Sequence, residues 1–189
     1  MILPKRPLKA EPSNKEVLKG KPIISRIQAG IRGGAAYRLI YLAPVPVDVF
    51  WKFKTDFGAD IFDGNKFVKA QRVLDRNRNV VIIENKLSIN SAATFRWRNT
   101  LHSGEYRLDF VLTNPEQCGQ RFHHGYFKLE PLGSQTKVLQ EAYFDFLGVS
   151  LWVNYPGKGG MYELLDYIAR WEQRTSHNLR DNYERSVEE

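Results

Sequence analysis

Four polar side chains interrupt otherwise apolar stretches of the sequence, and they have the clearest potential for chemistry. Asn85, Asn99, His124 and Gln140 each stand among hydrophobic residues spaced two apart. A buried amide without a partner costs about 1–3 kcal/mol, so each of these groups needs a hydrogen bond. Either they bond to one another, to the backbone or to trapped water, or they line a pocket and orient the polar end of a ligand.

Large hydrophobic side chains share the same faces as these polar groups. A few polar groups among aromatic side chains are typical of a small-molecule site. We therefore predict a ligand-binding set that joins the four polar residues to six aromatic residues and to two residues of a C-terminal helix. The added residues are Phe95, Trp97, Tyr106, Phe110, Tyr126, Phe144, Leu164 and Ile168.

Other chemistries find little support in the sequence. His123 and His124 are adjacent in a predicted strand and point to opposite faces, so they do not chelate one ion easily. Cys118 has no histidine near it in the sequence that would activate a thiolate. No nucleophile elbow, phosphate-binding glycine loop or zinc-binding His-Glu-x-x-His motif occurs. We assign no catalytic residue, no metal ligand and no cofactor.

The elements that carry these residues are mostly strands. Tyr37–Leu42 is rich in β-branched and aromatic residues, and a helix is predicted from about Val47 to Gly58. After residue 66 the hydrophobic period is two, which is typical of strands that expose one face. The later predicted strands are Phe67–Asp75, Asn79–Ile89, Thr94–His102, Tyr106–Leu112, Arg121–Glu130 and Gln135–Phe146, and Ile23–Ile27 is a short accessory strand.

One long amphipathic helix closes the chain. Met161, Leu164, Leu165, Ile168 and Trp171 recur at helical spacing, and the pattern can continue to about residue 183. Such a helix of roughly 23 residues is about 35 Å long and must cover its apolar stripe against the sheet. We therefore predict an α+β fold in which a curved antiparallel sheet of about six or seven strands wraps around a long C-terminal helix.

The segment from the first strand into the first helix resembles a known superfamily. Ala43-Pro44, Val47, Phe50-Trp51 and Asp56-Phe57 resemble the most recognisable stretch of the START-like (SRPBCC) helix-grip proteins. That superfamily includes Bet v 1-like proteins, lipid-transfer START domains, polyketide cyclases and coenzyme Q-binding proteins. The resemblance covers residues 36–185, and residues 58–63 depart from the usual pattern at the pocket entrance. It implies a helix-grip fold and no particular ligand.

The resemblance also suggests how the chain is organised. Residues 1–35 form a basic leader with Pro and Gly, which we expect to be partly disordered, residues 36–185 form the helix-grip domain, and residues 186–189 are a tail. Between the last strand and the long helix, Leu151, Trp152 and Tyr155 either extend the core or form a lid over the cavity mouth.

The distribution of charge argues against a nucleic-acid partner. The net charge is +7, but residues 1–35 carry eight basic and two acidic side chains, so the remaining residues contribute only +1. A nucleic-acid-binding domain needs a basic face on the fold itself. The leader is either a solvated segment or a weak, salt-dependent attractor for an anionic membrane or polymer. The sequence does not determine the cellular compartment. We expect the cytoplasm by default, and export if a signal peptide has been removed.

These observations lead to one main functional hypothesis and two alternatives. The main hypothesis is that the domain binds or transports an apolar small molecule (a lipid, quinone or polyketide-like compound) between its sheet and its C-terminal helix. The first alternative is an enzyme of the cyclase/aromatase type that uses Tyr, Asn and His in the cavity. The second is a protein-interaction module whose core is filled.

Overall fold

The computed structural model describes residues 12–58, 65–88, 93–148 and 160–178. Its described part contains three helices, two short 3-10 turns and eight strands. In chain order they are α1 (Asn14–Val17), β1 (Ile23–Ile27), β2 (Ala35–Ala43), α2 (Val47–Thr55), β3 (Val68–Asn77), β4 (Val80–Leu87), β5 (Thr94–His102), η2 (Ser103–Glu105), β6 (Arg107–Leu112), η3 (Glu116–Cys118), β7 (Gln120–Leu132), β8 (Gln135–Phe146) and α4 (Gly160–Asn178).

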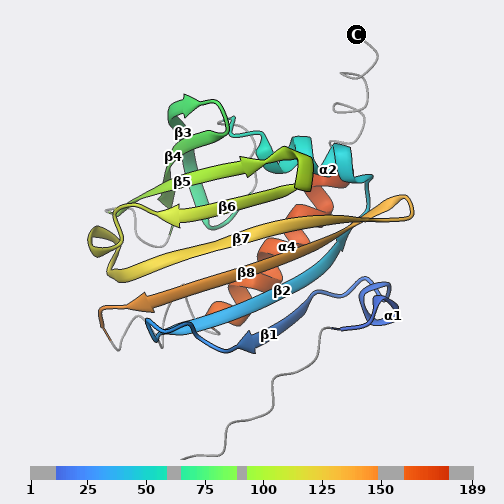
Figure 1. Cartoon of the computed structure of the whole chain (residues 1–189), viewed down its shortest axis with the longest axis horizontal. Helices are drawn as coiled ribbons and strands as arrows, with labels where there is room; N and C mark the ends of the chain where they lie inside the picture. Colours follow the sequence, from blue (N-terminus) through green and yellow to red (C-terminus); the bar gives the residue numbers. More distant parts are fainter. Residues whose placement is uncertain (1–11, 59–64, 89–92, 149–159, 179–189) are drawn as a thin grey trace, which may run out of the picture.

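The strands form a single antiparallel sheet in the order β1-β2-β8-β7-β6-β5-β4-β3. The sheet curves around α4, which lies along its inner side, and α2 lies near one end of α4 (Figure 1). The predicted α+β helix-grip arrangement is therefore confirmed. The sheet has slightly more strands than predicted, because the accessory strand β1 pairs with β2 along the sheet edge.

The helix α2 forms where Pro46 fixes the chain ahead of it and Asp48 occupies the first turn. Phe50 and Phe53 of α2 are buried, and the ring of Phe53 lies 6.2 Å from that of Trp171 in α4. The helix ends at Thr55, three residues before Gly58, where we predicted its end. Because α2 packs on α4 and on the sheet together, it closes one end of the space between them.

The helix α4 turns its apolar stripe toward the sheet. Leu165, Ala169 and Trp171 are buried in the main core cluster, which also contains Tyr41 of β2 and Val138 of β8. The predicted helix is thus confirmed over its described part, and its predicted continuation to residue 183 lies outside the described residues. No helix in the described ranges has the length and apolarity needed to cross a membrane.

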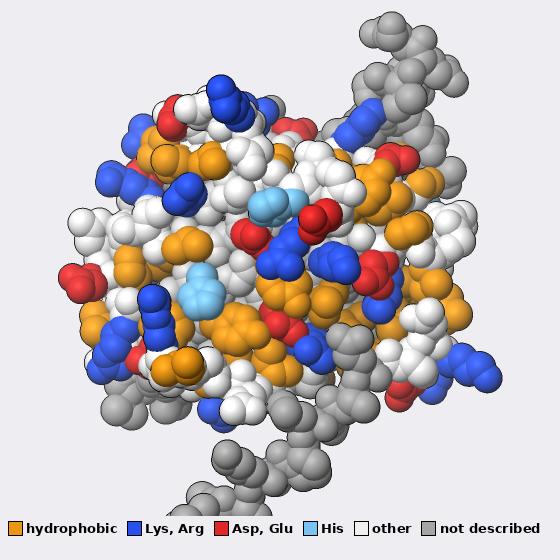
Figure 2. All heavy atoms as spheres, viewed as in Figure 1, with side chains coloured by type: hydrophobic (Ala, Val, Ile, Leu, Met, Phe, Trp, Pro, Cys, Tyr) orange, Lys and Arg blue, Asp and Glu red, His pale blue; other side chains and the backbone are white. Residues whose placement is uncertain are grey.

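The outer face of the sheet carries charges in opposite pairs. Glu84 on β4 accepts hydrogen bonds from Arg72 at 2.8 Å and from Arg96 at 2.9 Å, and the two guanidinium groups lower the pKa of its carboxyl. Figure 2 shows basic and acidic side chains interspersed with hydrophobic ones over this face. This mixture of charges does not form a continuous basic patch on the face shown.

Two segments of the predicted leader take part in the fold. Val17 of α1 is buried against Ile40 and Leu42 of β2, and β1 pairs along its full length with β2. The basic side chains of α1 and of the turn before β1, Lys15, Lys19 and Lys21, are exposed. The leader therefore anchors itself with one valine and one strand while its lysines remain in solvent.

Candidate ligand-binding cavity

A cavity of about 270 Å³ lies between the inner face of the sheet and the helices α2 and α4. Its described walls come from α2, from strands β3 to β8 and from α4. Most of the lining side chains are apolar, and aromatic residues form a large part of the surface. An apolar cavity of about 150 Å³ already admits benzene, so this space is large enough for a small organic molecule.

The sheet side of the cavity is an aromatic surface. Trp97 on β5 and Phe110 on β6 meet edge to face with their ring centroids 5.8 Å apart. Phe110 also contacts Phe127 on β7 at 5.3 Å. These rings come from three neighbouring strands with the same alternation, so the sheet holds them in place before any ligand arrives.

Three amide side chains line the cavity with one polar atom unpaired. Gln71 Nε2, Asn85 Oδ1 and Gln140 Oε1 have no hydrogen-bond partner within the described part of the chain. Each of these residues is more than 90% buried. Unpaired buried amides are costly, so water or a ligand in the cavity must complete their hydrogen bonds. Asn99, by contrast, donates from its Nδ2 to the carbonyl of Val81 at 3.4 Å.

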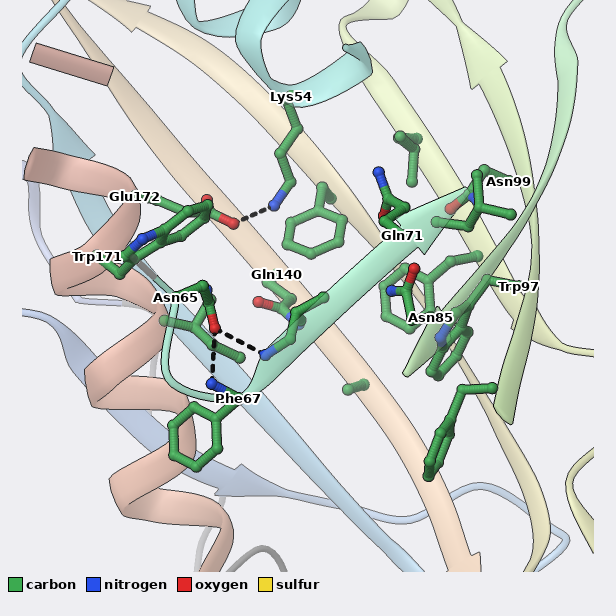
Figure 3. A pocket seen from close by; sticks show the side chains of 18 of the residues that line it. Lys54, Asn65, Phe67, Gln71, Asn85, Trp97, Asn99, Gln140, Trp171 and Glu172 are labelled. Carbon is green, nitrogen blue, oxygen red and sulfur yellow. Dashed lines mark hydrogen bonds and ion pairs between the residues drawn. The ribbon is translucent and has the colours of Figure 1, made fainter. Parts of the chain in front are cut away.

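One end of the cavity holds a buried ion pair. The Nζ of Lys54 donates to Oε1 of Glu172, and the hydroxyl of Tyr41 donates to Oε2 of the same carboxylate. The ammonium of Lys54 also lies over the Phe127 ring, 3.6 Å from its centroid. Burial and the neighbouring Glu172 carboxylate raise the pKa of Tyr41 well above its ordinary value. Figure 3 shows Lys54 and Glu172 beside α4, and Asn85 with Trp97 on the other side of the cavity.

A neutral histidine belongs to the aromatic surface. The ring of His123 lies 5.0 Å from Trp97 and 5.3 Å from Phe144, and its Nδ1 is 3.1 Å from Oε1 of Gln120. Removal from water and the adjacent His124 lower the pKa of His123 from 6.5 to about 3. His123 is therefore uncharged at neutral pH.

Eight of the twelve predicted ligand-binding residues lie on the cavity wall. The sheet contributes amides and aromatic rings, and α4 contributes aliphatic side chains from the opposite side. Whether these residues contact a ligand stays a prediction. The eight residues are Asn85, Phe95, Trp97, Asn99, Phe110, Gln140, Leu164 and Ile168.

The prediction for β7 placed the wrong residues on the inner face. His124 lies on the outer face, where it stacks on Tyr143 with 5.3 Å between ring centroids. Tyr126 is also outside, where the guanidinium of Arg107 lies 4.3 Å from its ring centroid. Their neighbours His123 and Phe127 line the cavity instead. The sequence does indicate which residues of β7 face the cavity. The charged residues Lys128 and Glu130 lie on the same face as Tyr126, whereas Leu129 lies on the same face as Phe127.

Two further predicted residues lie away from the described cavity wall. Tyr106 ends the η2 turn in a left-handed conformation (φ 47°), and its hydroxyl donates to Asp48 on α2. Because Tyr106 precedes the first residue of β6, it does not follow the alternation of inward and outward side chains that we assumed for this strand. Phe144 is buried but packs behind His123 and stacks on Tyr37 at 5.9 Å. The predicted lid residues Leu151, Trp152 and Tyr155 lie outside the described residues.

Gln71, Lys54 and Glu172 are cavity residues that the sequence analysis missed. Gln71 was hidden because β3 contains two register shifts, which break the alternation of its hydrophobic residues. Lys54 shares a helical face with Phe50 and Trp51, which was a weak signal that it points inward. Nothing local marks Glu172, because its partners Lys54 and Tyr41 are more than 100 residues away in the sequence.

The remaining candidates for chemistry are a cysteine nucleophile and a metal site. Cys118 is buried, and its burial raises the pKa of the thiol to about 11, so a thiolate is disfavoured. Among the described residues, no cluster of three or more His, Cys, Asp or Glu side chains is placed to hold a metal ion.

Solved structures with the same fold include enzymes and a protein classified only by superfamily. A START superfamily protein from Mycobacterium smegmatis is 14% identical, with a TM-score of 0.60 over 76% of this chain and 98% of that one. The Zhui aromatase/cyclase from Streptomyces sp. R1128 is 14% identical, with a TM-score of 0.53 over 87% and 96%. A norcoclaurine synthase from Thalictrum flavum is 9% identical, with a TM-score of 0.56 over 85% and 98%.

These similarities define the class of fold to which the chain belongs. No protein-family model matches the sequence, and no curated protein matches it. Identities of 9–14% establish a shared fold and leave the activity undetermined. The chain has the START-like helix-grip fold, as the segment from residue 43 to residue 57 predicted.

Proposed function

We propose that the protein binds a small, largely apolar molecule in the cavity between the sheet and α4. The cavity itself is the observation that carries this proposal, because a space of about 270 Å³ lined by aromatic rings remains within an otherwise packed domain. Covering about 200 Å² of apolar ligand surface supplies about 5 kcal/mol before the costs of association. That suffices for useful affinity only if a few polar contacts add to it.

The size of the cavity narrows the ligand class. Pockets for drug-sized ligands usually measure about 300–1,000 Å³, and this cavity of about 270 Å³ lies just below that range. A quinone headgroup or a polyketide-like molecule of two or three rings suits it better than a lipid with two acyl chains. The fold is shared with an aromatase/cyclase, which supports a ring-shaped ligand without assigning a reaction.

Binding is better supported than cyclase chemistry. The cyclase hypothesis needs an acid–base group in the cavity, and His123 with a pKa of about 3 is a weak base at neutral pH. Tyr106 and Tyr126, which we expected to assist it, point elsewhere. The described cavity wall includes no tyrosine.

Native mass spectrometry of the purified protein tests the proposal directly, with a co-purified apolar molecule as the expected result. A variant then locates the site. Ala142 lines the cavity, so Ala142→Leu should fill part of it and weaken binding of the fluorescent probe N-phenyl-1-naphthylamine at least tenfold. The matched control is Ala70→Leu on the exposed edge strand β3, which should leave probe binding unchanged. Equal binding by the two variants contradicts this location.

A further inference from the structure

The polar groups of the cavity differ at its two ends, and this difference bears on the ligand. At the α2–α4 end, Lys54 presents an ammonium with three N–H donors, one of which binds Glu172. At the β3–β4 side, Asn85 Oδ1 is an unpaired acceptor, and Nε2 of Gln71, the residue paired with Asn85 across the two strands, is an unpaired donor. The first end is suited to an acceptor on the ligand, and the second is suited to a hydroxyl group, which donates one hydrogen bond and accepts another.

The charge at the α2–α4 end decides between a neutral and an anionic acceptor. Lys54 and Glu172 neutralise each other, and their side chains are only 12% and 6% exposed. A ligand carboxylate at this place would add a buried negative charge next to Glu172, and the described cavity wall contains no second Lys or Arg to balance it. A neutral carbonyl oxygen accepts a hydrogen bond from the ammonium and adds no net charge.

We propose that the cavity selects a neutral molecule with a carbonyl group at the Lys54–Glu172 end and a hydroxyl group directed toward Asn85 and Gln71. This inference rests on the proposed function and refines it. Figure 3 shows Lys54 and Glu172 on one side of the cavity and Asn85 with Gln71 on the other. A flat hydroxylated aromatic ketone has this arrangement of polar groups.

Four probes with the same ring system test the inference on the unaltered protein. 2-Ethylnaphthalene is the apolar reference, 2-acetylnaphthalene adds a neutral carbonyl, 2-naphthoate adds a carboxylate, and 6-hydroxy-2-acetylnaphthalene adds a hydroxyl. Quenching of tryptophan fluorescence reports binding, because Trp97 and Trp171 both line the cavity. The ketone should bind at least about tenfold more tightly than the hydrocarbon and than naphthoate. The hydroxyl should add about threefold.

A pair of double variants assigns the carbonyl preference to the ion pair. Lys54→Met with Glu172→Gln removes both charges together and keeps an acceptor for Tyr41. In this variant the ketone should bind no more tightly than the hydrocarbon. The control, Lys52→Met with Glu163→Gln, alters the same two residue types on the same two helices outside the cavity wall and should retain the preference.

The outcomes separate the inference from the proposed function. Equal affinity for hydrocarbon and ketone, or naphthoate binding as tight as the ketone, overturns the inference while binding in the cavity stands. Preference for the ketone that survives in the charge-free variant also overturns it. Failure of all four probes to bind contradicts the proposed function, and the inference with it.

Discussion

At the scale of single residues, the inner and outer faces of β7 are distinguished most clearly by two adjacent histidines. His123 is surrounded by Trp97, Phe110 and Phe144, whereas His124 stacks on Tyr143 on the outer face. Burial lowers the pKa of both histidines, and it lowers that of His123 from 6.5 to about 3. A positive charge therefore costs more free energy at His123 than at the adjacent His124.

This difference predicts a pH-dependent stability that belongs to His123. Between pH 6.5 and pH 3 the unfolded chain binds a proton at this position and the folded chain does not, so stability falls as pH falls through this window. Relative to His123→Phe, the unaltered protein should lose up to about 2 kcal/mol of unfolding free energy between pH 6.5 and pH 5. Urea unfolding at several pH values measures this loss.

The same substitution at the neighbouring residue provides the control. His124→Phe removes a partly exposed histidine from the outer face and should keep most of the pH dependence of the unaltered protein. If His123→Phe shows the same loss between pH 6.5 and pH 5 as the unaltered protein, His123 does not stay neutral in the folded state. The aromatic surroundings described above would then fail to exclude water.

At the scale of elements, the sequence predicted the strands better than the faces they bury. The bounds of β5, Thr94–His102, and of β8, Gln135–Phe146, were predicted without error because hydrophobic residues alternate cleanly along both. In β7, aromatic residues occupy both faces near Tyr126, so local hydrophobicity did not determine its phase. The inward position of Gln71 depends on the register shifts in β3, and the Lys54–Glu172 pair depends on how α2 and α4 pack together. A local hydrophobic pattern contains neither kind of information.

A glycine in β7 explains how three strands approach one another beneath the cavity. A Cβ at Gly125 would lie 2.0 Å from the carbonyl oxygen of Glu141 and 2.6 Å from the ring of Phe110. A backbone oxygen at such a distance must move for any side chain to fit. Gly125 therefore lets β6, β7 and β8 form a floor on which Phe110 and Ala142 face the cavity.

Gly125→Ala should separate these strands and destabilise the domain by about 3 kcal/mol, because the clash involves backbone and a buried ring. Gly104→Ala is the matched control, since a Cβ at Gly104 meets no heavy atom within 4 Å. The control should change stability by less than about 0.5 kcal/mol. Thermal unfolding of both variants decides the matter, and equal midpoints would mean that the floor adapts without cost.

At the scale of the whole molecule, most of the net positive charge lies in the leader, whereas the apolar cavity lies in the rest of the chain. The leader carries +6 and the remainder only +1, while the cavity lies between the sheet and α4 of that nearly neutral remainder. Basic and acidic side chains alternate over the outer sheet face, which gives it no strong sign (Figure 2). If the molecule approaches an anionic surface, the leader is the region that would face it.

Replacing Lys5, Arg6, Lys9, Lys15, Lys19 and Lys21 by Gln reduces the leader from +6 to zero net charge without touching Val17 or β1. Each basic residue near an anionic membrane contributes about 1 kcal/mol, and this attraction is screened by salt. The unaltered protein should therefore sediment with vesicles that contain phosphatidylserine at 20 mM salt and detach at 500 mM.

The six-fold variant should remain in the supernatant at both salt concentrations. It should still bind N-phenyl-1-naphthylamine, because the leader contributes no residue to the described cavity wall. Neutral phosphatidylcholine vesicles control for adsorption through apolar surface. Sedimentation of the variant with anionic vesicles would move the contact from the leader to the folded domain. Loss of probe binding by the variant would instead show that the leader supports the sheet edge through more than Val17 and β1.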